Sequence, residues 1–175
     1  MNSDFSIDID DQKIAKITWN CEKKSMNVLS FEALETLEKL IDQVIENKNI
    51  KACILTSGKK DFAAGMDLNV LAQLKQSAGE NPAEGVFNGV MKMHAVLRKI
   101  ELAGMDPKTK KGGKPVVSVL PGTALGIGLE IPLSTHRIFA ANNSKAKIGL
   151  PEILVGLFPG AGGTTRLVRK LGAMA

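Results

Sequence analysis

Hydrophobic residues repeat with two different periods along this chain, and segments of the two kinds alternate. In residues 5–9 and 14–19 apolar residues occupy every second position, and the polar residues 10–13 lie between them, which predicts a β-hairpin with one buried face. Ser30 is a typical helix N-cap, and apolar residues then recur at spacings of three and four up to Asn47. This second pattern predicts an amphipathic helix directly after the hairpin.

Further segments keep the same order of strand and helix. Short buried strands are predicted at residues 52–56 and 116–120, and shorter ones at residues 138–140 and 146–148. A second long amphipathic helix is predicted over residues 86–100. Because strands followed by a helix recur, the pattern favours a mixed α/β layered fold.

The length of the chain, 175 residues and 18.7 kDa, suits one substantial domain. Hydrophobic residues make up 44% of it, but the apolar runs are only a few residues long. A membrane span needs about 20 such residues in succession. Residues 1–5 are acidic rather than basic, so they do not resemble a signal peptide. We therefore expect a cytoplasmic protein with no membrane span.

The cysteines and histidines predict neither a disulfide framework nor a metal site. Cys21 and Cys53 could form at most one disulfide, and neither has metal-ligand spacing to His94 or His136. We expect both cysteines to pack as small apolar groups. His94 lies beside the apolar stripe of the second predicted helix, where a position at the rim of the core is more common than a ligand role.

Positive charge is concentrated in the second half of the chain. Residues 1–88 carry 10 Lys or Arg against 14 Asp or Glu, a net charge of −4, while residues 89–175 carry 13 against 4, a net charge of +9. Five lysines fall between Lys99 and Lys114, in a stretch that is typical of an exposed loop and contains no aromatic residue. Base stacking needs aromatic side chains, so no nucleic-acid partner is expected. The positive charge is also compatible with a small polyanionic ligand.

Three segments combine glycines with acidic residues, at residues 62–68, 121–130 and 149–166. In the first two a strand leads into a small-residue turn and then a helix, which leaves backbone N–H groups unpaired at a helix N-terminus. Neither glycine-rich turn is a nucleotide motif, because the third glycine of G-x-G-x-x-G and the phosphate-loop pattern are both missing. The sequence also lacks the G-x-S-x-G elbow of serine hydrolases.

Two glutamates lie in apolar surroundings. Residues 89–175 contain only four acidic residues, and among these Glu130 and Glu152 are placed between Gly, Pro, Leu and Ile. Burial disfavours a charged carboxylate, so two such groups close together would have raised and coupled pKa values, as acid–base pairs do. Helix-end or salt-bridged glutamates would produce the same pattern, so the residues alone leave both interpretations open.

Several of these segments resemble those of a known protein family. Residues 62–68, 124–130, 149–153 and 159–164 are similar, in this order, to the signature segments of the enoyl-CoA hydratase/isomerase (crotonase) family. Residues 25–30 and 114–117 resemble two further family segments, and the similarity runs from about Ile14 to the C-terminus. The resemblance implies an α/β fold of the crotonase-like (ClpP/crotonase) type, a spiral of repeated ββα units.

The resemblance also implies an activity, the hydration of 2-enoyl-CoA to 3-hydroxyacyl-CoA in fatty acid β-oxidation. The backbone N–H groups of Met66 and Ile127 would form an oxyanion hole for the thioester oxygen. Glu130 would activate the water that adds to the β carbon, and Glu152 would deliver a proton to the α carbon. Two alternatives stay open: a Δ3-Δ2 enoyl-CoA isomerase that uses Glu152 as proton shuttle, and a non-catalytic CoA-binding fragment.

Coenzyme A enters this reaction as part of the substrate, so no separate cofactor is expected. The family contacts its acyl-CoA thioester through segments that match Lys24, Met26, Lys59, Phe62, Ala64, Gly65, Asp67, Leu68 and Gly126. Lys24 and Lys59 are the cationic candidates for the nucleotide. Gly65 and Gly126 suit the close approach of the thioester, which a side chain would block.

The chain also departs from the family pattern. Ile127 stands where a glycine is usual, and Pro132 is tolerable only in the first turn or so of a helix. Extra residues are expected in the loops at residues 103–113 and 141–145.

A family hydratase domain continues for several helices beyond the third motif. Residues 1–175 are therefore expected to be an incomplete hydratase domain that lacks the C-terminal lid and oligomerisation helices. The segment at residues 135–137 is most similar to the hydratase domain of multifunctional fatty acid oxidation enzymes, in which a 3-hydroxyacyl-CoA dehydrogenase follows. The expected partners are further copies of the chain or that dehydrogenase domain.

Overall fold

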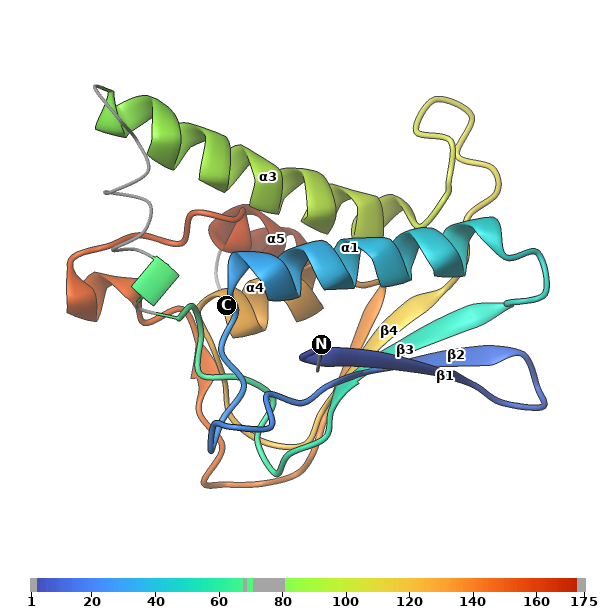
Figure 1. The fold of residues 1–175 in the computed structure, drawn as a ribbon, viewed down its shortest axis with the longest axis horizontal. Helices are drawn as coiled ribbons and strands as arrows, with labels where there is room; N and C mark the ends of the chain where they lie inside the picture. The colour runs from blue at the N-terminus through green and yellow to red at the C-terminus, as the bar shows by residue number, and fades with distance from the viewer. Residues whose placement is uncertain (1–2, 68, 71–80, 173–175) are drawn as a thin grey trace.

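The computed structural model describes residues 3–67, 69–70 and 81–172. Its elements, drawn in Figure 1, are β1 (Phe5–Ile9), β2 (Ile14–Trp19), α1 (Phe31–Glu46), β3 (Ala52–Ser57), α3 (Pro82–Leu102), β4 (Val116–Leu120), β5 (Ala124–Leu125), α4 (Ile127–Ser134), β6 (Arg137–Ala140), β7 (Ile148–Gly149), the 3-10 helix η1 (Glu152–Val155) and α5 (Gly163–Leu171). Two strands followed by a helix recur along this order, as the hydrophobic periods predict.

The larger sheet has five strands in the order β1-β2-β3-β4-β6. β1 and β2 form the predicted antiparallel hairpin, with Phe5 opposite Trp19, while the other neighbours in this sheet are parallel. β5 and β7 form a separate two-stranded parallel sheet. The strand expected at residues 146–148 is present only in part, because β7 begins at Ile148.

The helices lie on one side of the larger sheet, and α1 contacts both β1 and α3 (Figure 1). The predicted cap of α1 is confirmed, since Oγ of Ser30 accepts a hydrogen bond from N–H of Ala33 at 3.1 Å. The buried face of α1 includes Leu37 and Ile41 and packs into one core with Trp19 of β2. Local periodicity thus predicts both the helix and its buried face.

Helix α3 buries only part of its apolar stripe. Met93, Leu97 and Ile100 are buried as predicted, but Val86 and Phe87 near the helix start are exposed. The prediction of a continuous buried stripe is wrong at this end, because the described residues do not cover it. His94 is partly buried at the rim of the stripe.

Pro132 lies in the interior of α4 rather than in its first turn. From the sequence alone, a proline is expected to be tolerated only in the first turn or so of a helix. Beyond that turn, proline lacks the N–H that would donate to the carbonyl oxygen of the preceding turn. α4 is short and buried along its whole length, so tertiary packing rather than helix propensity determines its conformation.

Both cysteines are buried free thiols, as expected, and burial raises the pKa of Cys53 to about 12. The described residues contain no group of three or more His, Cys, Asp or Glu side chains that could hold a metal ion. Among the helices of the described part of the chain, none combines the length and the apolar character needed to cross a membrane.

Candidate active site

Two glycine-rich turns that are distant in sequence lie side by side. N–H of Phe62 and N–H of Ala63 donate to the carbonyl oxygen of Thr123 at 2.8 and 3.1 Å, and N–H of Leu125 donates to the carbonyl oxygen of Ala63 at 3.1 Å. Ala63 and Ala124 form a parallel bridge at this point. The first and second motifs of the sequence analysis therefore form one structural unit.

The closest approach of these turns requires glycine at two positions. Gly65 has a φ of 115° and Gly126 a φ of 55°, in the region that residues with a side chain rarely adopt. A β-carbon at Gly126 would lie 3.3 Å from Oε1 of Glu152 and 4.0 Å from Cα of Gly65. The two glycines and Glu152 thus lie at one place, on three different segments.

The amides of Met66 and Ile127 have no hydrogen-bond acceptor among the residues that the structure describes. Met66 follows Gly65, whose carbonyl oxygen is paired with Leu29, and Ile127 is the first residue of α4. The N–H groups of a first helical turn have no partner within the helix. Two unpaired donors on adjacent turns can bind an oxygen that develops negative charge. The side chain of Ile127 packs in the core.

Glu130 is held at the N-terminus of α5. Its side chain is only 3% exposed, and Oε1 accepts hydrogen bonds from N–H of Ala161 at 2.9 Å and of Gly163 at 2.8 Å. Burial raises the pKa of Glu130, the two amides oppose this shift, and the charge of Glu152 raises the pKa further. Glu130 thus combines a helix-end position with a desolvated carboxyl group.

Glu152 is the first residue of η1 and is half-buried. Its Oε2 is buried and has no hydrogen-bond partner among the described residues. An unsatisfied buried oxygen is costly, and such groups are found where a ligand, a water molecule or a proton is exchanged. Because Oε1 of Glu152 lies near Gly126, this carboxyl group faces the turn that carries the Ile127 amide.

Arg166 supports the loop that binds Glu130, a role that the sequence alone did not indicate. Its Nη1 donates to the carbonyl oxygen of Ala161 at 2.8 Å, and Nη2 lies 3.6 Å from Oε2 of Glu101. Its charge also lowers the pKa of Glu130. The sequence does show an arginine three residues after the glycine pair of the third motif. It does not show that this arginine pairs with Glu101, which lies on α3 and is distant in sequence.

The loop before α1 contributes Lys24, one of the two cationic candidates for the coenzyme. Lys24 forms an ion pair with Asp67, and their hydrogen bond raises the pKa of Lys24 and lowers the pKa of Asp67. A cavity of about 450 Å³ lies beside this pair, lined also by Cys21, Val28 and Ser30. A phosphate at this place would compete with Asp67 for Lys24.

The other residues expected to contact the substrate differ in how exposed they are. Met26 and Lys59 are partly buried and Ala64 is exposed. Phe62 is fully buried, with its ring 5.9 Å from that of Trp19 in an edge-on contact. A substrate contact through the Phe62 side chain is therefore not supported, because the core already surrounds the ring.

Leu68, the last of the expected substrate contacts, lies outside the described residues.

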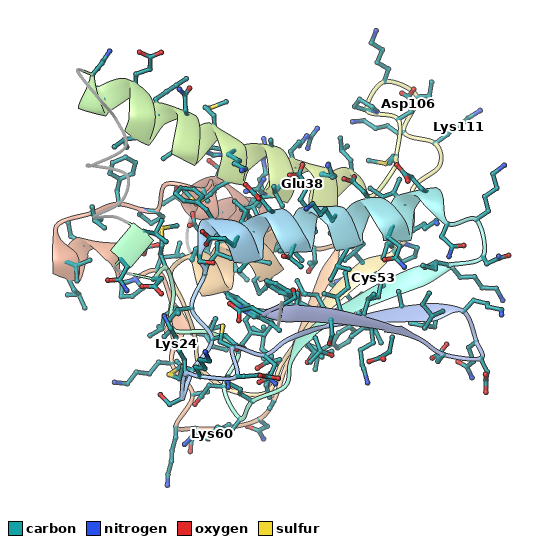
Figure 2. All side chains as sticks on the ribbon, viewed as in Figure 1. Lys24, Glu38, Cys53, Lys60, Asp106 and Lys111 are labelled. Atoms are coloured by element: carbon teal, nitrogen blue, oxygen red, sulfur yellow. The ribbon has the colours of Figure 1, made fainter. Side chains whose placement is uncertain are left out.

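In Figure 2, Lys24 and Lys60 lie in the loops below the helices, while Asp106 and Lys111 lie in the lysine-rich loop at the opposite end. That loop is therefore not part of the candidate site.

The chain is similar to known proteins over almost its whole length. The sequence profile described as "Enoyl-CoA hydratase/isomerase" matches residues 10–175. The "Fatty acid oxidation complex subunit alpha" of Shewanella oneidensis is 31% identical over 173 residues, which cover 98% of this chain and 22% of that protein.

Solved structures give the same result. The enoyl-CoA hydratase from Bacillus anthracis superimposes with a TM-score of 0.78 at 32% identity, covering 98% of this chain and 59% of that one. The enoyl-CoA hydratase from Thermoplasma volcanium has a TM-score of 0.78 at 26% identity, with 98% and 60% covered. The expected α/β crotonase fold is thereby confirmed. The chain spans about a fifth of the curated relatives and less than two thirds of these solved chains.

Proposed function

The chain belongs to the enoyl-CoA hydratase/isomerase family, and on this premise we propose that it hydrates 2-enoyl-CoA thioesters to 3-hydroxyacyl-CoA, a step of fatty acid β-oxidation. One observation carries the proposal. The amides of Met66 and Ile127, which have no acceptor among the described residues, lie on joined turns beside Glu152, whose charge also acts on Glu130. This combination supplies an electrophilic site and two proton-transfer groups.

The two amides would hold the thioester carbonyl oxygen. When water adds to the β carbon, the electrons of the double bond move toward this oxygen and form an enolate. Donors that are already in place stabilise that charge without reorganisation, and one donor is typically worth about 3–4 kcal/mol. The glycines at positions 65 and 126 leave room for the thioester beside these donors.

The carboxyl groups would divide the proton transfers. Glu130 takes a proton from a water molecule while the oxygen of that water bonds to the β carbon. Glu152 gives a proton to the α carbon as the enolate collapses. A raised pKa makes the carboxylate of Glu130 a stronger base, and its two amide bonds keep Oε1 in one position. The proton taken up by Glu130 then returns to Glu152 through solvent, so both carboxyl groups are restored and the net change is addition of one water molecule across the double bond.

A Δ3-Δ2 enoyl-CoA isomerase is the second candidate, and one observation favours it. Among the described residues, Glu152 is the one whose carboxylate has a buried oxygen without a partner, whereas Oε1 of Glu130 accepts hydrogen bonds from two amides. A single carboxylate that removes a proton from one carbon and returns it to another is sufficient for isomerisation. Glu130 would then only orient the substrate or a water molecule.

The partners belong to the same proposal. Ile153, Leu154, Val155 and Phe158 are all exposed, next to the site and within a few residues of one another. Contiguous exposed apolar surface of this kind marks contact surfaces. We propose that residues 1–175 are part of a hydratase domain whose lid and oligomerisation helices lie elsewhere in the protein, and that it acts as a homo-oligomer. The partial coverage of the hydratase chains supports this.

The proposal is tested with the full natural chain that contains these residues. Hydration of crotonyl-CoA is followed as loss of the conjugated thioester absorbance, and isomerisation of a 3-enoyl-CoA as its gain. Glu152→Gln should abolish both activities, whereas Glu130→Gln should abolish hydration only. Glu35→Gln, which alters an exposed ion pair with Lys92 on the helix surface, serves as control. Full hydration by Glu130→Gln would refute the role of Glu130, and no turnover of either substrate by the wild type would refute the function.

A further inference from the structure

We propose that Asn27 is a positioning residue that holds the turn presenting the Met66 amide to the substrate. The inference rests on the proposed function, because it assigns Asn27 a role in the oxyanion hole of that reaction. Asn27 is fully buried although its side chain is polar and uncharged. Buried amides persist where their hydrogen bonds are satisfied, so its partners show what it connects.

The side chain of Asn27 joins three segments. Oδ1 accepts a hydrogen bond from N–H of Cys21 at 2.9 Å. Nδ2 lies 3.0 Å from the carbonyl oxygen of Trp19, 3.0 Å from Oγ of Ser57 and 2.8 Å from the carbonyl oxygen of Phe62. The end of β2, the end of β3 and the start of the turn at residues 62–66 thus meet at one amide group.

The backbone around Asn27 explains why the Met66 amide has no acceptor within the described part of the chain. The carbonyl oxygen of Asn27 accepts from N–H of Ala64 at 2.8 Å. N–H of Leu29 donates to the carbonyl oxygen of Gly65, and the carbonyl oxygen of Leu29 accepts from N–H of Asp67, both at 2.9 Å. Leu29 and Met66 are therefore partners in a parallel bridge.

In parallel pairing of this kind one residue bonds to the two neighbours of its partner, and the partner's own N–H points away. The Met66 N–H consequently points away from residues 27–29. The turn is bonded on its other side too, through Ala63 to Thr123 and Leu125. Asn27 anchors the start of the turn from one side, and the second glycine-rich turn anchors it from the other.

A neutral amide is the side chain that fits these contacts. Aspartate would keep an acceptor for Cys21 but lose both donors and place a negative charge next to the carbonyl oxygens of Trp19 and Phe62. Alanine would leave the Cys21 amide and the carbonyl oxygen of Phe62 without their partner, while the carbonyl oxygen of Trp19 would keep its bond from N–H of Gly58. In either case the Phe62–Met66 turn loses its side-chain anchor at Asn27, while Glu130 keeps its bonds to the amides of Ala161 and Gly163.

The test compares Asn27→Asp and Ser57→Ala with Val44→Ala, a substitution in the fully buried core of α1 that is remote from the turn. Ser57→Ala removes a single partner of Asn27 and keeps the test possible if Asn27→Asp does not fold. Each folded variant is assayed for kcat and KM on crotonyl-CoA, and for the enolate absorbance of bound acetoacetyl-CoA. Amide hydrogen exchange of residues 62–67 is measured in parallel.

We expect kcat to fall about tenfold or more in Asn27→Asp, a fraction of the 10²–10³ that loss of a whole oxyanion donor costs. KM should change less than twofold, bound acetoacetyl-CoA should show less enolate, and exchange should rise in the turn. Ser57→Ala should change the same quantities in the same direction, but less. Val44→Ala should lose stability and keep kcat.

An unchanged kcat with unchanged exchange in the turn would overturn the inference, and so would a fall in kcat of equal size in Val44→Ala. If the wild type turns over no substrate, the proposed function fails, and hydrogen exchange at residues 62–67 still decides whether Asn27 holds the turn.

Discussion

Adding one methyl group at Gly163 is expected to destabilise the protein and to slow its reaction through its contact with Glu130. Gly163 is the first residue of α5, and its N–H donates to Oε1 of Glu130 at 2.8 Å. A β-carbon at this position would lie 2.8 Å from Cγ and 2.9 Å from Oε1 of Glu130. Real β-carbons do not approach other atoms this closely, so the Glu130 side chain or the start of α5 must move.

Two opposing effects determine the size of the change. Alanine in a helix is favoured over glycine by about 0.5–1 kcal/mol. Overpacking a buried site costs about 1–3 kcal/mol, and a carboxylate that moves away gives up amide bonds of about 1.5–3 kcal/mol. The structure relaxes by one of these routes rather than both. Gly163→Ala should therefore lower the free energy of unfolding by about 1–2 kcal/mol.

Activity should fall with it, because Glu130 is the proposed base and a small displacement of a catalytic group reduces the rate strongly. We expect kcat for crotonyl-CoA to fall by about 10²-fold. The control is Gly160→Ala in the same loop, where a β-carbon would meet only the carbonyl oxygen of Phe158 at 3.9 Å. Urea unfolding and turnover are measured for both variants. If Gly163→Ala equals Gly160→Ala in stability and kcat, the reasoning is refuted.

Three further predictions concern single side chains. Burial raises the pKa of Glu130 above its ordinary value of 4.5, so the folded state binds this proton more tightly than the unfolded state. The wild type should therefore lose stability relative to Glu130→Gln as pH rises from 4.5 through the folded-state pKa of Glu130. Urea unfolding midpoints of both proteins at about pH 4 and about pH 8 measure this difference. A gain in the relative stability of the wild type at the higher pH would contradict the prediction. Lys114→Met should lower the melting temperature, because Nζ donates to carbonyl oxygens at the C-terminal end of α1, at 2.5 Å to Val44 and at 2.7 Å to the C-cap residue Asn47. Such bonds are worth about 1–2 kcal/mol. Lys111→Met on the exposed loop is the control, and equal melting temperatures for the two variants would exclude a capping role of Lys114. Lys24→Met should raise KM for crotonyl-CoA at unchanged kcat, with less than about 1 kcal/mol lost from the half-exposed ion pair; an unchanged KM would remove Lys24 from the coenzyme site.

Most of the fold could be predicted because its signals are local. The alternation in residues 5–9 and 14–19 and the three- and four-residue spacing after Ser30 each specify an element together with its buried face. Predictions were weaker where tertiary packing dominates. Val86 continues the apolar stripe of α3 but is exposed, and Pro132 lies inside α4 because that helix is buried on all sides.

The candidate site divides in the same way. Residue patterns indicate which turns require glycine and which two glutamates lie among apolar residues, since both features depend on a few neighbouring residues. Long-range packing brings the turn at residues 62–66 against residues 123–125, places Glu130 at the start of α5 and buries Phe62 in the core. Those contacts join segments far apart in the chain, and no local pattern of side chains encodes the partner that a distant segment supplies.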